Sequence, residues 1–198
     1  MAKHIEIMRK TSDTKSRIVS AAWKLFYEQG YDNTTIDDIL EAAHVSRGSF
    51  YHYFDGKDAL LSSLSFLFDE KYKEIYPLIP PEMNSIDKLL YMNRELFGMI
   101  ENTISIELLA RLFATQLITK GEKHLLDRSR VYYRLLRQVI LEGQERGEIR
   151  ADANANELSK LYALCERGIM YDWCICNGDY SLKEYASSVM PRFLESFR

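Results

Sequence analysis

Apolar residues recur at helical spacing along nearly the whole chain, and this periodicity is the strongest constraint on its fold. In the first periodic segment, one helix face carries Ile18, Ala22, Leu25 and Phe26, and Gly30 follows as a C-terminal cap. Glycine and proline are scarce, at 9 and 4 of 198 residues. No segment alternates apolar with polar residues over the length of a strand. The sequence therefore predicts an all-α fold.

Capping residues divide the pattern into separate helices. Ser12 or Asp13 can cap the first helix. Two short helices are expected at 35–43 and 46–53, and a long helix is expected from Lys57 to about Ile75. A proline cluster then ends that helix, since proline cannot continue it. Further helices are expected at about 84–102, 104–119, 125–146, 154–176 and 181–197.

The overall charge is mildly acidic, so any role with nucleic acid must rest on local features. The chain has 26 Lys and Arg against 29 Asp and Glu, which gives −3. The first 17 residues hold five basic and two acidic side chains, a net +3, and could add phosphate contacts or enter a minor groove. No apolar run reaches the ~18–20 residues that a membrane span needs. Three cysteines in a chain of this size favour a reduced, cytoplasmic setting.

The segment from Thr35 to Phe54 has the length and spacing of a helix-turn-helix. Its apolar residues can face a core formed with the first helix: Ile36, Ile39, Leu40, Val45, Phe50 and Phe54. The residues left outside are Arg47, Gly48, Ser49, Tyr51 and His52. A helix N-terminus with free N–H groups and an arginine suits phosphates and base edges. A plain helical corner with no role in DNA binding is the alternative.

The run TTIDDILEAAHVSRGSFYHYFDGKDAL, residues 34–60, resembles the signature of tetracycline-repressor-type (TetR-type) transcriptional regulators, as does the approach AAWKLF at 21–26. The resemblance covers about residues 14–62. It implies a homodimeric repressor with a three-helix DNA-binding domain over 1–56 and an effector-binding and dimerisation domain over 57–198. A small-molecule effector would release the repressor from a palindromic operator.

The resemblance also implies residue roles. The DNA-binding residues would be Thr35, Ser46, Arg47, Gly48, Ser49, Tyr51, His52, Tyr53 and Lys57. Arg47 is the candidate for a bidentate contact to guanine, and Thr35 and Lys57 are candidates for phosphate contacts. Three nearby acidic residues, Asp37, Asp38 and Glu41, are expected to point away from DNA into solvent, because negative charge facing phosphate opposes binding.

The C-terminal two-thirds shows no catalytic constellation, so no enzyme is expected. Cys174 and Cys176 would project about 200° apart on a helix and could not share one metal ion; no metal or cofactor is expected. Aromatic stripes in this region could be plain core or could line a pocket. The candidate ligand-binding residues are Phe97, Phe113, Gln116, Tyr132, Tyr133, Tyr162, Cys165, Glu166, Ile169 and Trp173. They suggest a mainly apolar or aromatic effector, while Glu166 would favour a cation.

The last two helices carry broad apolar faces that suggest a homodimer joined by four helices. The faces hold Leu158, Leu161, Leu164, Ile169, Met170 and Trp173, then Leu182, Tyr185, Ala186, Val189, Met190, Phe193, Leu194 and Phe197. The alternative is that these faces pack wholly within one subunit. Two other functions also remain open: an all-α small-molecule binding protein with a vestigial helix-turn-helix corner, or a small all-α enzyme.

Overall fold

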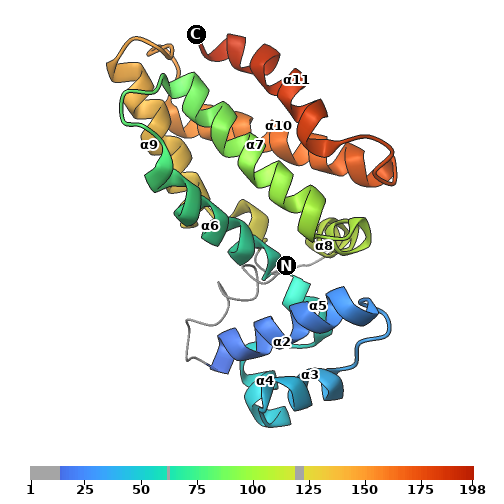
Figure 1. The fold of residues 1–198 in the computed structure, drawn as a ribbon. Helices are drawn as coiled ribbons and strands as arrows, with labels where there is room; N and C mark the ends of the chain where they lie inside the picture. The colour runs from blue at the N-terminus through green and yellow to red at the C-terminus, as the bar shows by residue number, and fades with distance from the viewer. Residues whose placement is uncertain (1–13, 62, 119–122) are drawn as a thin grey trace. The chain divides into compact units, whose positions relative to one another are not determined.

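Every regular element described by the computed structural model is a helix (Figure 1). The structure describes residues 14–61, 63–118 and 123–198, and these ranges contain no strand. The all-α prediction is confirmed. The predicted cap at Ser12 or Asp13 and most of the basic N-terminal segment lie outside the described residues. Contacts divide the chain into two compact units, Met1–Leu64 and Ser65–Arg198.

The described residues of the first unit form four helices that lie wholly within it. These are α2 (Thr14–Gln29), α3 (Ile36–Ala43), α4 (Arg47–Tyr53) and α5 (Lys57–Leu61). Helix α2 packs against both α3 and α4. The core of this unit contains side chains with no solvent exposure: Ile18, Ala22, Ile39, Phe50 and Leu60. Helices of seven or eight residues are unstable alone, so burial of these apolar side chains holds α3 and α4 in place.

The prediction of one continuous helix from Lys57 to Ile75 is wrong. Helix α5 ends at Leu61, and α6 (Leu64–Ile75) begins after a turn. In that turn, the Ser63 N–H donates a hydrogen bond to the carbonyl of Leu60, three residues earlier, at 2.9 Å. The Ser63 hydroxyl also accepts a hydrogen bond from Trp23 Nε1 at 2.7 Å. A contact to a residue 40 positions away therefore accompanies the end of a helix that local periodicity alone would continue.

The second unit is a bundle of longer helices with short 3₁₀ turns between them. Its elements after α6 are η2 (Tyr76–Leu78), α7 (Ser85–Thr103), α8 (Ile106–Ile118), η3 (His124–Leu126), α9 (Val131–Glu145), α10 (Ala155–Ile175), α11 (Leu182–Leu194) and η4 (Glu195–Phe197). Helix α7 packs along α9 and α11, and α10 packs against α8, α9 and α11 (Figure 1). None of the described helices is both long and apolar enough to cross a membrane.

Most of the apolar surface of α10 and α11 is used inside the subunit. Among the residues predicted on these faces, the buried ones are Leu158, Ile169, Met170, Trp173, Leu182, Ala186, Met190, Leu194 and Phe197. The large apolar side chains of α10 that stay exposed are Leu161, Leu164, Tyr171 and Ile175. Together with the exposed Gly168, they recur every three or four residues along one side of the helix. The apolar face available to a partner is therefore a narrow stripe and not the broad face that the sequence suggests.

Candidate functional site

Helix α4 is fixed at both ends by local hydrogen bonds. At its start, Ser46 accepts a hydrogen bond from the N–H of Ser49 at 3.1 Å through its hydroxyl oxygen. At its end, the N–H of Phe54 donates to the Phe50 carbonyl at 2.9 Å. The turn before α4 needs a left-handed residue, His44, with φ of 54°. The helix is therefore held in one rotation about its axis, which decides the side chains it displays.

That rotation buries one side of α4 and exposes the other. The Phe50 ring has no solvent exposure and lies 5.7 Å, centroid to centroid, from the buried Phe54 ring. The exposed residues of the helix are Arg47, Gly48, Tyr51, His52 and Tyr53. The structure thus brings the predicted contact residues of α4 together on one outward side, although their DNA contacts stay a prediction.

Gly48 offers an open approach to the backbone of this exposed side. A Cβ atom placed on it would meet only Ser46 Oγ, at 3.9 Å. Nothing in the described part of the chain therefore requires glycine at this position. Because glycine weakens a helix relative to alanine, a need for it would have to come from outside the protein, as close contact with a bound partner would provide.

The acidic residues of α3 have specific partners. Asp37 accepts a hydrogen bond from Arg47, and both side chains are exposed. Asp38 forms a reciprocal capping box with Thr35, in which Thr35 N–H donates to Asp38 Oδ2 at 2.8 Å and Asp38 N–H donates to Thr35 Oγ1 at 3.1 Å. These bonds lower the pKa of Asp38. Asp37 is exposed to solvent, as expected, and it is also the ion-pair partner of Arg47, the residue proposed to contact guanine.

Lys57 is turned towards the first unit's own backbone. Its ammonium group donates to the carbonyls of Tyr31 at 2.7 Å and Thr34 at 2.9 Å, and lies 4.2 Å from the centroid of the Tyr31 ring. These contacts hold the loop between α2 and α3. A phosphate contact by Lys57 stays a prediction and would require the ammonium group to share or leave these carbonyls.

The second unit contains a buried carboxylate, Glu166 on α10, with 2% exposure. Its Oε1 accepts a hydrogen bond from Asn93 Nδ2 on α7 at 2.8 Å, and its Oε2 accepts one from the Tyr132 hydroxyl on α9 at 2.6 Å. Burial raises the pKa of Glu166, while the interactions with Asn93, Tyr132 and Tyr162 and the charge of Arg167 act in the opposite direction. Three helices thus meet at one acidic group.

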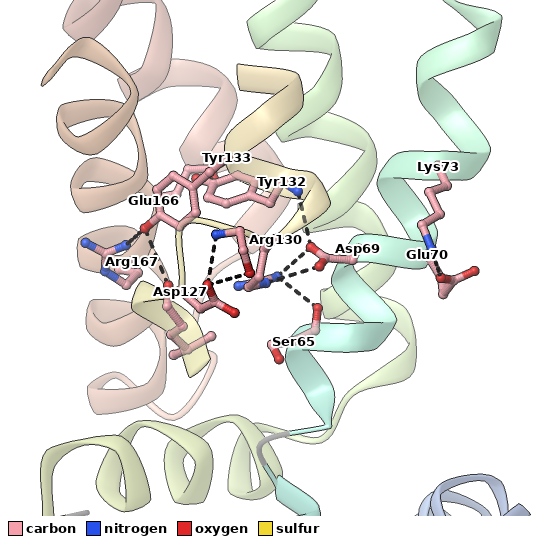
Figure 2. Close-up of polar contacts among 12 residues, drawn as sticks. Ser65, Asp69, Glu70, Lys73, Asp127, Arg130, Tyr132, Tyr133, Glu166 and Arg167 are labelled. Carbon is pink, nitrogen blue, oxygen red and sulfur yellow. Dashed lines mark hydrogen bonds and ion pairs between the residues drawn. The ribbon is translucent and has the colours of Figure 1, made fainter. Parts of the chain in front are cut away.

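A second polar cluster lies beside it (Figure 2). Arg130 donates to Asp69 Oδ1 at 2.8 Å and to the Ser65 carbonyl at 2.8 Å. Both side chains of the Arg130–Asp69 ion pair are nearly buried, at 9% and 12% exposure. A separate hydrogen bond joins α10 to α9, in which Arg167 donates to the Tyr133 hydroxyl at 3.1 Å. The ion pair joins α6 to the start of α9.

A cavity of about 30 Å³ lies between these clusters, which is room for on the order of one or two water molecules. Its lining is Phe68, Tyr72, Leu96, Leu125, Arg130, Tyr132, Ala163, Glu166, Arg167 and Met170. Tyr132 and Glu166 were in the predicted ligand-binding set. The other eight were missed, because their proximity depends on how α6, α7, α9 and α10 pack and leaves no local signal in the sequence.

The remaining predicted ligand-binding residues do not line this cavity. Phe97 and Ile169 are buried in the bundle, and Phe113 stacks edge-on with Tyr171. Gln116 accepts a hydrogen bond from the N–H of Leu125. Others make contacts of their own: Tyr133 with Leu125, Tyr162 with Leu89, Cys165 with Met190 and Trp173 with Tyr180. No group of three or more His, Cys, Asp or Glu side chains within the described ranges could hold a metal ion.

Comparison with known proteins finds a family model that matches most of the first unit. The family model "Bacterial regulatory proteins, tetR family" matches residues 18–64. The HTH-type transcriptional regulator YuxN of Bacillus subtilis is 39% identical over 59 residues, which are 29% of this chain and 20% of YuxN. The chain thus matches about a fifth of the length of YuxN.

Other similarities extend over nearly the whole chain. The HTH-type transcriptional repressor DhaR of a Mycobacterium species is 24% identical over 186 residues, 92% of this chain and 93% of DhaR. Thermus thermophilus FadR, a TetR-family transcriptional repressor solved in complex with lauroyl-CoA, shares the fold with a TM-score of 0.75 at 24% identity, covering 94% of this chain and 95% of FadR. The family match over residues 18–64 and the similarity to DhaR support a transcriptional regulator of the tetR family, and the likeness to FadR shows the shared fold.

Proposed function

We propose that this chain is a homodimeric, ligand-responsive repressor that binds a palindromic DNA operator through α4. The observation that carries the proposal is the two-sided character of α4. Phe50 is fully buried, while Arg47, Gly48 and Tyr51 are exposed on one short, capped helix. A helix displayed in this way can enter the major groove, where base edges differ in their hydrogen-bonding groups.

Each exposed residue has a role in this proposal. Arg47 would donate two hydrogen bonds to guanine, the commonest specific contact of an arginine in the major groove. Tyr51 would contact backbone or a thymine methyl group. The residues proposed to fix the register by backbone contacts are Thr35, Ser46, Ser49, His52, Tyr53 and Lys57. The Ser46 and Ser49 hydroxyls already lie 2.9 Å apart at the N-terminus of α4, where helical N–H groups favour phosphate.

A homodimer would use the exposed stripe of α10. Leu161, Leu164, Tyr171 and Ile175 are 47–60% exposed and recur with the spacing of a helix–helix seam. The exposed Tyr185 of α11 could extend the contact. A two-fold interface is self-complementary, and it presents two copies of α4 to the DNA. The operator should therefore be palindromic, with half-sites about 34–36 Å apart or adapted from that spacing.

The effector would act through α6. This helix begins at Leu64, where the two compact units divide, and carries Phe68 and Tyr72 in the wall of the cavity. A ligand that enlarges the cavity would have to displace α6 or its neighbours, since about 30 Å³ is far below the ~300–1,000 Å³ of ordinary ligand sites. Such a ligand weakens DNA binding only if it prefers the displaced arrangement.

The test is selection of bound sequences from random duplex DNA by the purified full chain, followed by binding titrations at fixed salt. The proposal predicts enrichment of an inverted repeat, bound more tightly than shuffled DNA by about 10³-fold or more. Enrichment of no sequence, or of a sequence without two-fold symmetry, would contradict it and favour a helical carrier or enzyme. The proposed site of action is the cytoplasm, in keeping with the free thiols of Cys165, Cys174 and Cys176.

A further inference from the structure

Glu166 is a buried carboxylate whose hydrogen bonds come from neutral groups. Asn93 and Tyr132 are its donors, and within the described ranges no Lys, Arg or His lies in an ion pair with it. A buried carboxylate without a cationic partner is costly. A carboxylate group has about four acceptor positions, and the Tyr162 hydroxyl also interacts with Glu166, so capacity for one further donor remains. The charge of Arg167 acts on Glu166 from a partly exposed position, but among the described residues no cation forms an ion pair with this carboxylate.

The Tyr72 hydroxyl is a second group with unused hydrogen-bonding capacity in the same cavity. Tyr72 is 1% exposed, and its hydroxyl oxygen has no hydrogen-bond partner among the described residues. Burial and the nearby charge of Glu166 raise the pKa of Tyr72 well above its usual range. Since buried polar groups normally have partners, this hydroxyl and Glu166 together mark a polar place that the protein itself does not fill.

Aromatic rings surround that place. The Tyr72 and Tyr132 ring centroids lie 5.2 Å apart, and Phe68 lines the same cavity. The faces of aromatic rings attract cations electrostatically, and the effect is larger when water is excluded. A buried carboxylate beside such rings is chemically complementary to an organic cation.

The two arginines of the cavity wall are already engaged by other groups. Arg130 is held by Asp69 and the Ser65 carbonyl, so its charge is paired. The Arg167 side chain donates to the Tyr133 hydroxyl and is only partly buried, so solvent screens its charge. Neither arginine therefore replaces a cation at Glu166. An anionic ligand is a poorer match for this cavity. Arg130 is already paired with Asp69, and Glu166 would repel the anion.

We propose that this cavity binds a protonated amine with an apolar body, whose N–H groups donate to Glu166 and Tyr72. The apolar body would contact Phe68, Leu96 and Met170. The inference deepens the proposed function, on which it rests, by naming the chemical class of the effector. Because the cavity is small, the amine would bind by moving wall side chains or α6.

The test uses three ligands of similar shape and different charge: 2-phenylethylamine, 2-phenylethanol and phenylacetate. Binding to the wild-type chain is measured by calorimetry or ligand-observed NMR at pH 7. The amine should bind at least about tenfold more tightly than the other two. Equal or tighter binding of the alcohol or the acid, or no binding of the amine up to about 10 mM, would overturn the proposal. This comparison needs no variant, so a folding defect cannot obscure it.

Three variants locate the site. Glu166→Gln should weaken amine binding by about 10- to 100-fold, since it removes a hydrogen bond to a charged group. Glu157→Gln, at an exposed position of the same helix, should leave amine binding unchanged. Tyr72→Phe should weaken amine binding without lowering the thermal midpoint, because the hydroxyl has no hydrogen-bond partner among the residues that the structure describes. Unchanged amine binding in Glu166→Gln would overturn the proposal.

DNA binding separates this inference from the proposed function. If the amine binds through Glu166 and lowers operator affinity, both stand. If it binds through Glu166 to a protein that recognises no specific DNA, the cation site stands and the regulator proposal fails. If operator binding is specific but the amine does not bind, the cation site alone is overturned.

Discussion

The Arg47 guanidinium on α4 donates a hydrogen bond to the Asp37 carboxylate on α3, and both side chains remain exposed to solvent. The residue best suited to read guanine is therefore held, in the absence of DNA, by a carboxylate from the neighbouring helix. Binding DNA would exchange this ion pair for contacts to a base. An exposed ion pair contributes only about 0–1 kcal/mol, so the exchange is feasible, and its cost should be measurable.

Replacing Asp37 with asparagine should strengthen DNA binding. The change frees Arg47 and removes a negative charge near phosphate, so we expect operator affinity to rise by up to about fivefold. Fluorescence anisotropy at fixed salt measures this. Glu41→Gln removes the same charge from an exposed position of α3 without touching the ion pair, and the difference between the two variants isolates it. A fall in affinity for Asp37→Asn would show that Asp37 positions Arg47 for reading.

Replacing Gly48 with alanine should change stability and DNA binding in opposite directions. Alanine is the better helix former by up to about 1 kcal/mol, and its methyl group meets only Ser46 Oγ at 3.9 Å. Urea unfolding should therefore show equal or greater stability. Operator affinity should fall, because the methyl group occupies the surface that the DNA backbone or a base edge approaches. Unaltered operator affinity would mean that DNA does not come close to Gly48.

The helix-turn-helix and the cavity beside Glu166 differ in how well the sequence predicts them. The start of each helix in the helix-turn-helix follows from a local cap, Thr35 or Ser46, so both were placed to within a residue. The end of α5 was missed, because it involves the contact between Ser63 and Trp23, 40 positions apart. Local periodicity carries no information about such a contact.

Of the residues that line the cavity, the sequence predicts only Tyr132 and Glu166, whose side chains differ in kind from those around them or belong to an aromatic stripe. Glu166 is an acidic residue in an apolar stripe, and Tyr132 lies in an aromatic one. Asp69 and Arg130 are ordinary charged residues in the sequence, and only packing joins them across 61 positions. Phe97, Phe113 and Trp173 look like pocket residues by composition, yet none of them lines the cavity. An aromatic stripe alone does not distinguish core from pocket.

The Asp69–Arg130 pair should be a strong contributor to the stability of the second unit. Asp69→Asn would leave a nearly buried guanidinium without its counter-ion, and we expect a loss of about 3–5 kcal/mol in unfolding free energy. Urea denaturation measures it. On the same helix, the Glu70–Lys73 pair is more exposed (Figure 2), so Glu70→Gln should change stability by less than about 1 kcal/mol. Equal effects of the two substitutions would contradict this account of burial.

The protonation of Glu166 should make stability fall as pH rises. Burial raises the pKa of this carboxyl in the folded chain above its usual 4.5, so over the interval between the two values the folded state holds more protons than the unfolded state. Stability from this group is then complete below pH 4.5 and is lost as pH rises through the folded pKa. Relative to Glu166→Gln, the wild-type chain should be more stable at pH 4.5 than at pH 7.5 in urea unfolding. A pH-independent difference would contradict the raised pKa.

The proposed recognition of DNA by α4 depends on contacts made by Arg47. The most direct measurement is the affinity of the wild-type chain, Arg47→Ala and Arg137→Ala for the selected operator and for a set of single base-pair variants. Arg137 is an exposed arginine of α9 in the second unit. Arg47→Ala should lose about 1–3 kcal/mol on the operator and stop discriminating at one base pair in each half-site, while Arg137→Ala matches wild type. Equal operator affinity and equal base preference in all three proteins would contradict the assignment of α4 as the reading helix.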